Sequence, residues 1–169
     1  IAAAIDKYCH ISCRHLPPFF DHKHRIVYSK VESVKKIEEI QHPSVRGCLE
    51  YLNIDDGIEV HHVGGLPARS GIGSSSSFTV GLLHALRTFL GQVVTHHQLA
   101  RDAIQVEQVL LKESVGIQDQ VIAAYGGFQQ LHMGPGNNWI VESLKLSPDY
   151  LTELESHILL GRNFGSPFL

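Results

Sequence analysis

The chain has 169 residues, of which 43% are hydrophobic, so it can bury one sizeable core, and its length suggests a single domain. Its 14 Lys and Arg against 17 Asp and Glu give a net charge of −3, which argues against general nucleic-acid binding. No apolar run approaches the roughly 20 residues of a membrane span, no signal-peptide pattern is present and the 3 cysteines form an odd count, so we expect a cytoplasmic protein without membrane contact.

The first part of the chain predicts strands that alternate with helical segments. Period-two alternation of apolar residues predicts three strands, over 4–13, 25–29 and 58–63. Residues 33–40 are charged and helix-like, and Pro43 opens a helix that runs through Leu52 and stops at Gly57. The third strand leads directly into a loop rich in glycine.

This loop runs from Gly65 to Gly73 and continues into four serines, Ser74–Ser77, which open an amphipathic helix closed by Gly91. Glycines let the backbone turn tightly with its N–H groups pointing inward, and serine hydroxyls add donors at the positive end of the helix dipole. The plain alternative is that Ser74 merely caps a helix, but a cap needs only one serine. The segment therefore predicts an oxyanion site, and phosphate is the commonest such ligand.

Three known loop motifs fit this segment poorly. A Walker A loop needs a lysine after its second glycine, and none is present. Gly71 and Gly73 match the first two glycines of the dinucleotide fingerprint, but Ser76 replaces the third. The fingerprint also needs an acidic residue at the end of a second strand about 20 residues later, and none is present there. A serine-hydrolase elbow needs G-x-S-x-G, which the segment lacks.

The second half of the chain predicts helices followed by a hairpin. Thr95 caps a helix that runs to about Leu111, and a short helix follows over 119–124 until Gly126 and Gly127 break it. The remaining elements are, in order, hairpin strands over 128–133 and 139–146, a helix over 148–155 and a last strand over 157–160. This order of strands, helices and strands indicates a two-layer α+β domain.

Two carboxylates stand out as candidates for chemistry. Glu107 lies on the apolar stripe of the helix after Thr95, and a buried carboxylate is costly unless it meets a cation or hydrogen-bond donors. Three interpretations of Glu107 are open. It reaches solvent at the edge of the stripe, or it forms a salt bridge with Arg69 or Arg101. With a phosphate loop upstream, it can instead be a magnesium ligand. Asp119 begins the next short helix, where it is either an ordinary helix-opening residue or the group that faces an acceptor hydroxyl.

A zinc site is the other metal alternative, since Cys9, Cys13, His22 and His24 place four zinc-type ligands in order. The two cysteines lie on an expected strand, however, and their spacing departs from the common C-x2-C knuckle. We therefore interpret the 12 histidines as scattered surface and core residues.

The segment from Pro67 to Ser76 resembles the second signature of the GHMP kinases, P-x-x-x-G-[LI]-G-S-S-[AS]. That superfamily is named after galactokinase, homoserine kinase, mevalonate kinase and phosphomevalonate kinase. The resemblance continues through Glu107-Gln108, Gly116-Ile117-Gln118-Asp119-Gln120 and Ala123-Ala124-Tyr125-Gly126-Gly127-Phe128. It is most similar to the branch that phosphorylates heptose 7-phosphate, and it extends from Ala4 to about Leu160.

The resemblance implies a ribosomal-protein-S5-domain-2-like fold and the N-terminal half of a kinase that transfers phosphate from ATP to a sugar or sugar phosphate. Residues 1–160 would form the ATP-binding domain without its first strand, and 161–169 would begin a C-terminal domain or a linker. The family's first signature, which often supplies a catalytic cation, and its third signature are both absent. Arg69 is the best cation in the loop, or else a solvated loop charge.

By the same resemblance, ATP would be held by residues of the loop and the helix start: Pro67, Arg69, Gly71, Ile72, Gly73, Ser74, Ser75 and Ser76. Ser75 and Glu107 would bind Mg²⁺, and Asp119 would be the catalytic residue that faces the sugar hydroxyl. Two other classes stay open: an inactive domain that binds a nucleotide or sugar phosphate, and a dinucleotide-binding oxidoreductase. An oxidoreductase has no need of a magnesium carboxylate at Glu107.

Overall fold

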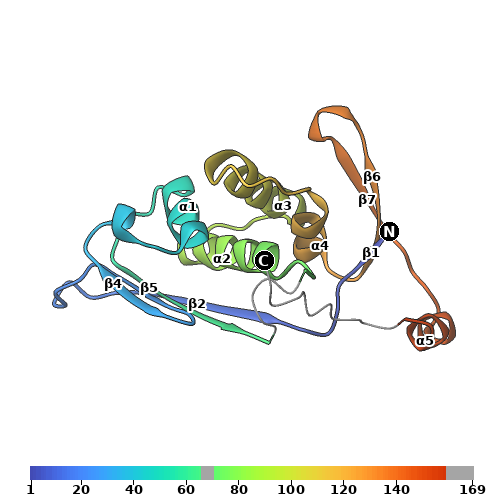
Figure 1. Ribbon diagram of the computed structural model, residues 1–169, viewed down its shortest axis with the longest axis horizontal. Helices are drawn as coiled ribbons and strands as arrows, with labels where there is room; N and C mark the ends of the chain where they lie inside the picture. Colours follow the sequence, from blue (N-terminus) through green and yellow to red (C-terminus); the bar gives the residue numbers. More distant parts are fainter. Residues whose placement is uncertain (66–70, 159–169) are drawn as a thin grey trace, which may run out of the picture.

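The computed structural model describes residues 1–65 and 71–158, and it shows a four-stranded sheet with helices on one face (Figure 1). The strands are ordered β2-β5-β3-β4 and span Cys9–His15, Ile58–Gly64, His24–Val27 and Val31–Val34. β3 and β5 run parallel, whereas β2 with β5 and β3 with β4 form antiparallel pairs. The helices over this sheet span Pro43–Tyr51 (α1), Ser74–Phe89 (α2), His96–Ile104 (α3) and Gln118–Tyr125 (α4).

The main core lies between this sheet and α2. Ile58 and Val60 alternate inward on β5, as does Ile26 on β3, and each is at most 1% exposed. They belong to one apolar cluster with Leu82 and Leu86 of α2, which are fully buried. Burial of each such side chain contributes about 1.5–3 kcal/mol, so the sheet fixes the position of α2 and of its N-terminus.

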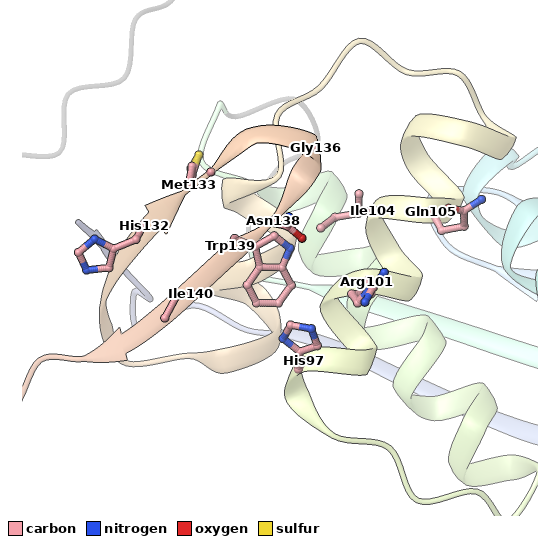
Figure 2. Close-up of a pocket in the computed structure, with 11 residues that line it drawn as sticks. His97, Arg101, Ile104, Gln105, His132, Met133, Gly136, Asn138, Trp139 and Ile140 are labelled. Carbon is pink, nitrogen blue, oxygen red and sulfur yellow. The ribbon is translucent and has the colours of Figure 1, made fainter.

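A second, smaller sheet lies beyond α3 and α4 (Figure 1). Its strands are ordered β1-β6-β7 and span Ala2–Ala3, Phe128–Met133 and Trp139–Ser143. The β6–β7 hairpin turns through a 3-10 segment, Pro135–Asn137 (η3), and packs Trp139 against α3 (Figure 2). Helix α5 (Pro148–Ser156) follows, and none of the helices described here is long and apolar enough to cross a bilayer.

The two-layer α+β class predicted from the sequence is confirmed. The predicted strand over 4–13 is confirmed over 9–13, which belong to β2, and is wrong over 4–8, because these residues cross from the small sheet to the large one and leave β1 and β2 in different sheets. A hydrogen bond from the Ala4 N–H to the Gly127 carbonyl (2.8 Å) holds the start of this crossing. The last predicted strand is also absent at His157 and Ile158, and its other residues lie outside the described part.

Residues 33–40, predicted as helix-like, contain no α-helix. Val31–Val34 form the edge strand β4, and a single 3-10 turn, Ile37–Glu39 (η1), follows. Glu32 explains the difference, because its buried carboxylate accepts hydrogen bonds from the Tyr28 hydroxyl and from the backbone N–H groups that lead into α1. These bonds hold the chain in an extended approach to α1.

The structure divides the helix predicted from Thr95 to Leu111 into two parts. Thr95 is the N-cap as expected, because its hydroxyl accepts a hydrogen bond from a backbone N–H of the first turn (3.1 Å). After α3, residues Gln105–Leu110 (η2) are π-helical, and the Leu111 N–H donates to the Val106 carbonyl at 2.9 Å. A π-helical segment widens the turn and redirects its side chains, and this one carries Glu107.

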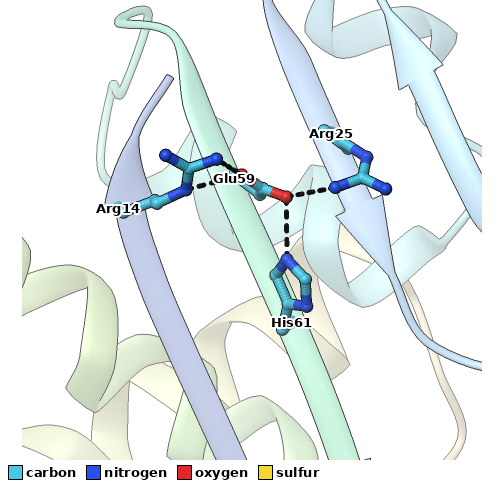
Figure 3. Close-up of polar contacts among 4 residues, drawn as sticks. All are labelled: Arg14, Arg25, Glu59 and His61. Carbon is cyan, nitrogen blue, oxygen red and sulfur yellow. Dashed lines mark hydrogen bonds and ion pairs between the residues drawn. The ribbon is translucent and has the colours of Figure 1, made fainter. Parts of the chain in front are cut away.

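The outer face of the large sheet carries a carboxylate surrounded by cationic side chains (Figure 3). Glu59 of β5 is 2% exposed, and it accepts hydrogen bonds from Arg14 of β2 (2.6 Å) and Arg25 of β3 (2.5 Å). The ring of His61 lies 2.8 Å from the same carboxylate. The bonds with His61, Arg25 and Arg14 lower the pKa of Glu59 from 4.5 to about 2, although burial opposes the shift.

Replacing Glu59 by Gln should lower the free energy of unfolding near neutral pH by about 1–3 kcal/mol, because two arginines then lose their buried anion. Since folding lowers the pKa of Glu59, this stabilisation is present above about pH 4.5 and is lost as the pH falls toward 2. Urea unfolding of wild type, Glu59→Gln and the exposed control Glu50→Gln measures the effect. The difference in the free energy of unfolding between wild type and Glu59→Gln should be smaller at about pH 3 than at neutral pH. An equal difference at both pH values would contradict the lowered pKa of Glu59.

Candidate active site

The end of the glycine loop and the start of α2 form a turn that favours glycine. Gly71 and Gly73 have φ values of 75° and 72°, in the left-handed region. Gly73 is the N-cap of α2 and its carbonyl accepts a hydrogen bond from the Ser77 N–H (2.9 Å), so the alternative that Ser74 is the cap is wrong. The first turn of α2 therefore presents Ser74–Ser76 at the positive end of the helix dipole.

Asp119, in the first turn of α4, lies directly against this turn. A Cβ atom on Gly73 would stand 3.3 Å from the carboxyl carbon of Asp119 and 3.4 Å from its Oδ2. The missing side chain at Gly73 thus lets a carboxylate reach the N-terminus of α2. Two segments that the sequence analysis singled out separately meet here.

A groove of about 1010 Å³ opens over this meeting point. Its lining includes Asp119 and four residues that were predicted to hold ATP: Ile72, Gly73, Ser74 and Ser75. Ser76 is buried behind them, and Gly71 is exposed at the end of the loop. Pro67 and Arg69 lie outside the described residues.

Glu107 lies behind the first turn of α2 and is only 1% exposed. Its Oε2 accepts hydrogen bonds from the Ser76 hydroxyl (3.0 Å) and from the side-chain amide of Gln120. The alternative of an edge residue that reaches solvent is therefore wrong. Within the described residues Glu107 forms no ion pair with Arg101, and the other predicted partner, Arg69, lies outside them.

The residues around Glu107 fit a magnesium ion in their chemistry. Glu107 Oε1 is buried and has no hydrogen-bond partner in the described part of the chain, so this oxygen is available to coordinate a cation. Mg²⁺ prefers oxygen ligands, and the nearby hydroxyls and carboxylates supply only those. Within that part Glu107 accepts a hydrogen bond from Ser76 and none from Ser75. The pairing of Ser75 with Glu107 as ligands of one ion stays a prediction.

Zinc receives no support. Over residues 1–65 and 71–158, no three His, Cys, Asp or Glu side chains gather closely enough to hold a metal ion. Cys9, Cys13, His22 and His24 therefore do not form the ligand set considered above. All three cysteines of the chain are free thiols.

The groove contains charged residues that the sequence analysis did not single out. Glu113 lines it beside Asp119, and burial, followed by the negative charge of Glu107, raises the pKa of Glu113. Lys7 is the one Lys or Arg among the described lining residues. No local pattern marks Lys7 or Glu113, because the β1–β2 crossing and the end of η2 bring them to the groove only in the folded chain.

One wall of the groove is aromatic. The rings of His42 and His62 lie on Phe78 of α2, each with its centroid 4.8 Å from the phenyl centroid. Burial lowers the pKa of both histidines. The interpretation of the histidines as scattered residues missed this pair, although the alternation on β5 turns His62 to the same side as Val60 and could have indicated it.

The sheet does not favour a dinucleotide-binding oxidoreductase. Such enzymes bind their cofactor on a mostly parallel sheet built from βαβ units. Here the strand before the loop, β5, pairs antiparallel with β2, and β3 with β5 is the parallel pair in the described strands.

Comparisons with known proteins identify the family of the chain. The model of the GHMP kinases N terminal domain matches residues 36–127, which is more than half of the chain. A curated relative, D-glycero-alpha-D-manno-heptose 7-phosphate kinase of Campylobacter jejuni, is 30% identical over 101 residues, which cover 60% of this chain and 30% of the relative. The match thus spans less than a third of that relative's length.

Solved structures share the fold. A D-glycero-D-manno-heptose 1-phosphate kinase from Bacteroides thetaiotaomicron superposes with a TM-score of 0.81 at 23% identity, over 91% of this chain and 53% of that one. Lactococcus lactis galactokinase complexed with galactose superposes with a TM-score of 0.66 at 18% identity, over 86% and 41%. The chain thus spans about half the length of these structures. On the strength of the family match, the chain belongs to the GHMP kinases.

Proposed function

We propose that the protein is an ATP-dependent kinase that phosphorylates a hydroxyl of a sugar or sugar phosphate, with a heptose phosphate as its acceptor. The meeting of Gly73 and Asp119 in one groove carries this proposal, because phosphoryl transfer needs a phosphate cradle beside an acceptor-facing group. The names of the Campylobacter and Bacteroides relatives suggest the acceptor class. We also propose a cytoplasmic location, because ATP is available there.

On the donor side, the backbone N–H groups of Gly71 and Gly73 and the hydroxyls of Ser74 and Ser75 would donate hydrogen bonds to phosphate oxygens. Glu107 and Ser75 would hold Mg²⁺, which when bound neutralises charge on the phosphates. The acidic lining supports this assignment, because carboxylates that face a triphosphate need a cation between them. Pro67 and Arg69 complete the proposed loop contacts.

On the acceptor side, Asp119 accepts a hydrogen bond from the attacking hydroxyl and orients its oxygen toward the terminal phosphate. Asp119 would then take the proton as the new phosphorus–oxygen bond forms, while the bond between the terminal phosphorus and the bridging oxygen breaks and ADP leaves. The start of α4 favours a negative charge at this position through the helix dipole. Lys7 stands in the same groove and would attract the phosphate of a sugar-phosphate acceptor.

Mg-ADP binding tests the donor side on this chain. Isothermal titration should show binding at submillimolar to millimolar nucleotide, and Glu107→Gln should weaken it at least about tenfold with magnesium but little in EDTA. The amide keeps the shape of the side chain and removes the charge that attracts the cation. Glu50→Gln, an exposed change of the same kind on α1, should bind as wild type does.

Two results would count against this assignment. No heat at millimolar Mg-ADP from a folded chain would show that the loop is not a preformed phosphate site. Equal binding by Glu107→Gln and wild type would make Glu107 a structural residue. A third result would favour the alternative of an inactive binding domain. In that case the chain binds Mg-ADP, but the longest form of the protein that its gene encodes transfers no phosphate to any sugar tested.

A further inference from the structure

A second cavity lies away from the groove, between α3 and the β6–β7 hairpin (Figure 2). Its volume is about 600 Å³, and it shares no lining residue with the groove among those described. Arg101 and Gln105 line it from the helical side, and Asn138 and Trp139 line it from the hairpin. Small-molecule sites have volumes of about 300–1,000 Å³, so this cavity has room for a ligand of mononucleotide size.

The charge of this cavity favours an anion. Arg101 is exposed, and its guanidinium makes no hydrogen bond or ion pair with the described residues. No Asp or Glu occurs among the described lining residues. His132 belongs to the lining but lies on the side of β6 away from Arg101 in Figure 2, 3.5 Å from Glu142. Among the described residues Arg101 is thus a cation without a counter-ion, and a guanidinium binds phosphate oxygens in a bidentate manner.

The floor of the cavity favours a flat ring. Trp139 is 9% exposed, and the ring of His97 lies on it with centroids 4.3 Å apart and planes 33° apart. Tyr125 also contacts the indole edge-to-face, with ring centroids 6.0 Å apart. Ile104 adds an apolar side, and Figure 2 shows His97 next to Trp139, with Arg101 one turn farther along α3. Flat aromatic groups of this kind stack with planar ligands, at about 1–3 kcal/mol per nucleobase.

We propose that this cavity binds a small aromatic phosphate of the size of a nucleoside monophosphate, separately from the kinase groove. The phosphate lies on Arg101, and the ring lies against Trp139 and His97. Gln105 and Asn138 supply polar groups for the edge of the ring. This inference stands on the cavity alone and holds whether or not the groove transfers phosphate.

The chain offers a direct probe, since Trp139 is its only tryptophan. Titration with AMP should change the Trp139 fluorescence in a saturable way. Ribose 5-phosphate, which lacks the base, and adenosine, which lacks the phosphate, should each bind at least about tenfold more weakly. Phenyl phosphate should bind more weakly than AMP and more tightly than ribose 5-phosphate, because it keeps a phosphate and a flat ring but has a smaller ring than adenine.

Variants separate this cavity from the groove. Arg101→Gln should weaken AMP at least about tenfold, whereas Lys35→Gln, an exposed loss of one positive charge elsewhere, should leave it unchanged. Glu107→Gln should also leave the Trp139 signal unchanged, although it weakens Mg-ADP in the groove. Thermal unfolding by circular dichroism checks that each variant is folded. The proposal fails if AMP gives no saturable signal, if Arg101→Gln binds AMP as wild type does, or if either half of AMP binds as tightly as the whole.

Discussion

Replacing Asp119 by Asn should lower the turnover number about 100-fold or more and leave the affinity for Mg-ATP nearly unchanged. Asp119 lies against the N-terminal turn of α2, since a Cβ atom on Gly73 would stand 3.3 Å from its carboxyl carbon. In the proposed function this carboxylate serves the acceptor hydroxyl rather than the phosphates, so its loss should affect turnover and not the affinity for nucleotide. Asn has the same shape, so the contact with Gly73 and the fold should persist while the proton acceptor is lost.

Steady-state kinetics with a panel of heptose 7-phosphate, mannose and galactose measure this effect, on the longest form of the protein that its gene encodes. Asp149→Asn is the matched control, because Asp149 is also an acidic residue in the first turn of a helix, α5, outside the groove. It should keep normal turnover. Nearly normal turnover by Asp119→Asn on the preferred sugar would make Asp119 an ordinary helix-opening residue.

The candidate site was predictable from the sequence where it depends on local backbone chemistry. Left-handed glycines and a serine-rich helix start are local features, so the turn at Gly73 follows from the residues themselves. Asp119 was also identifiable, since its position at a helix start is local. The sequence does not show that these two segments touch, because that contact depends on how α2 and α4 pack.

Other features depend on tertiary structure and were missed for that reason. The π-helical segment carries Glu107, which accepts a hydrogen bond from the Ser76 hydroxyl, and a regular α-helical pattern does not show where a π-helical turn replaces it. The crossing of residues 4–8 between two sheets looks like a continuous strand, since apolar alternation does not reveal where a strand changes sheet. Lys7 enters the groove only because of that crossing.

One buried network joins the three helices that position the site. Asp102 of α3 is fully buried and accepts hydrogen bonds from Arg87 of α2 (2.7 Å), Tyr51 of α1 (2.8 Å) and the Gln98 side chain (2.7 Å). Burial, together with the bond to Asp102, raises the pKa of Tyr51 to about 12. The network fixes α2 relative to α3, and α3 continues into the segment that carries Glu107.

Replacing Asp102 by Ala should therefore lower the free energy of unfolding by about 3–5 kcal/mol, because Arg87 and the Tyr51 hydroxyl lose their buried partner together. Domains of this size have total stabilities of about 5–15 kcal/mol, so Asp102→Asn, which keeps the shape, provides a milder variant that stays folded. Guanidinium unfolding measures both, and absorbance titration should show a lower pKa for Tyr51 in Asp102→Asn.

The double variant Asp102→Leu with Arg87→Met separates charge from packing. It removes both ends of the ion pair and should be less destabilised than the sum of its single changes, since neither charge is left buried alone. Asp55→Ala, which removes the carboxylate of the exposed pair with Lys23, should change the free energy of unfolding far less than Asp102→Ala does. A loss in Asp102→Ala as small as that in Asp55→Ala would show that α2 and α3 are held by apolar packing alone. In that case the position of Glu107 behind the phosphate turn would depend on the core around Leu82 and Leu86 rather than on Asp102.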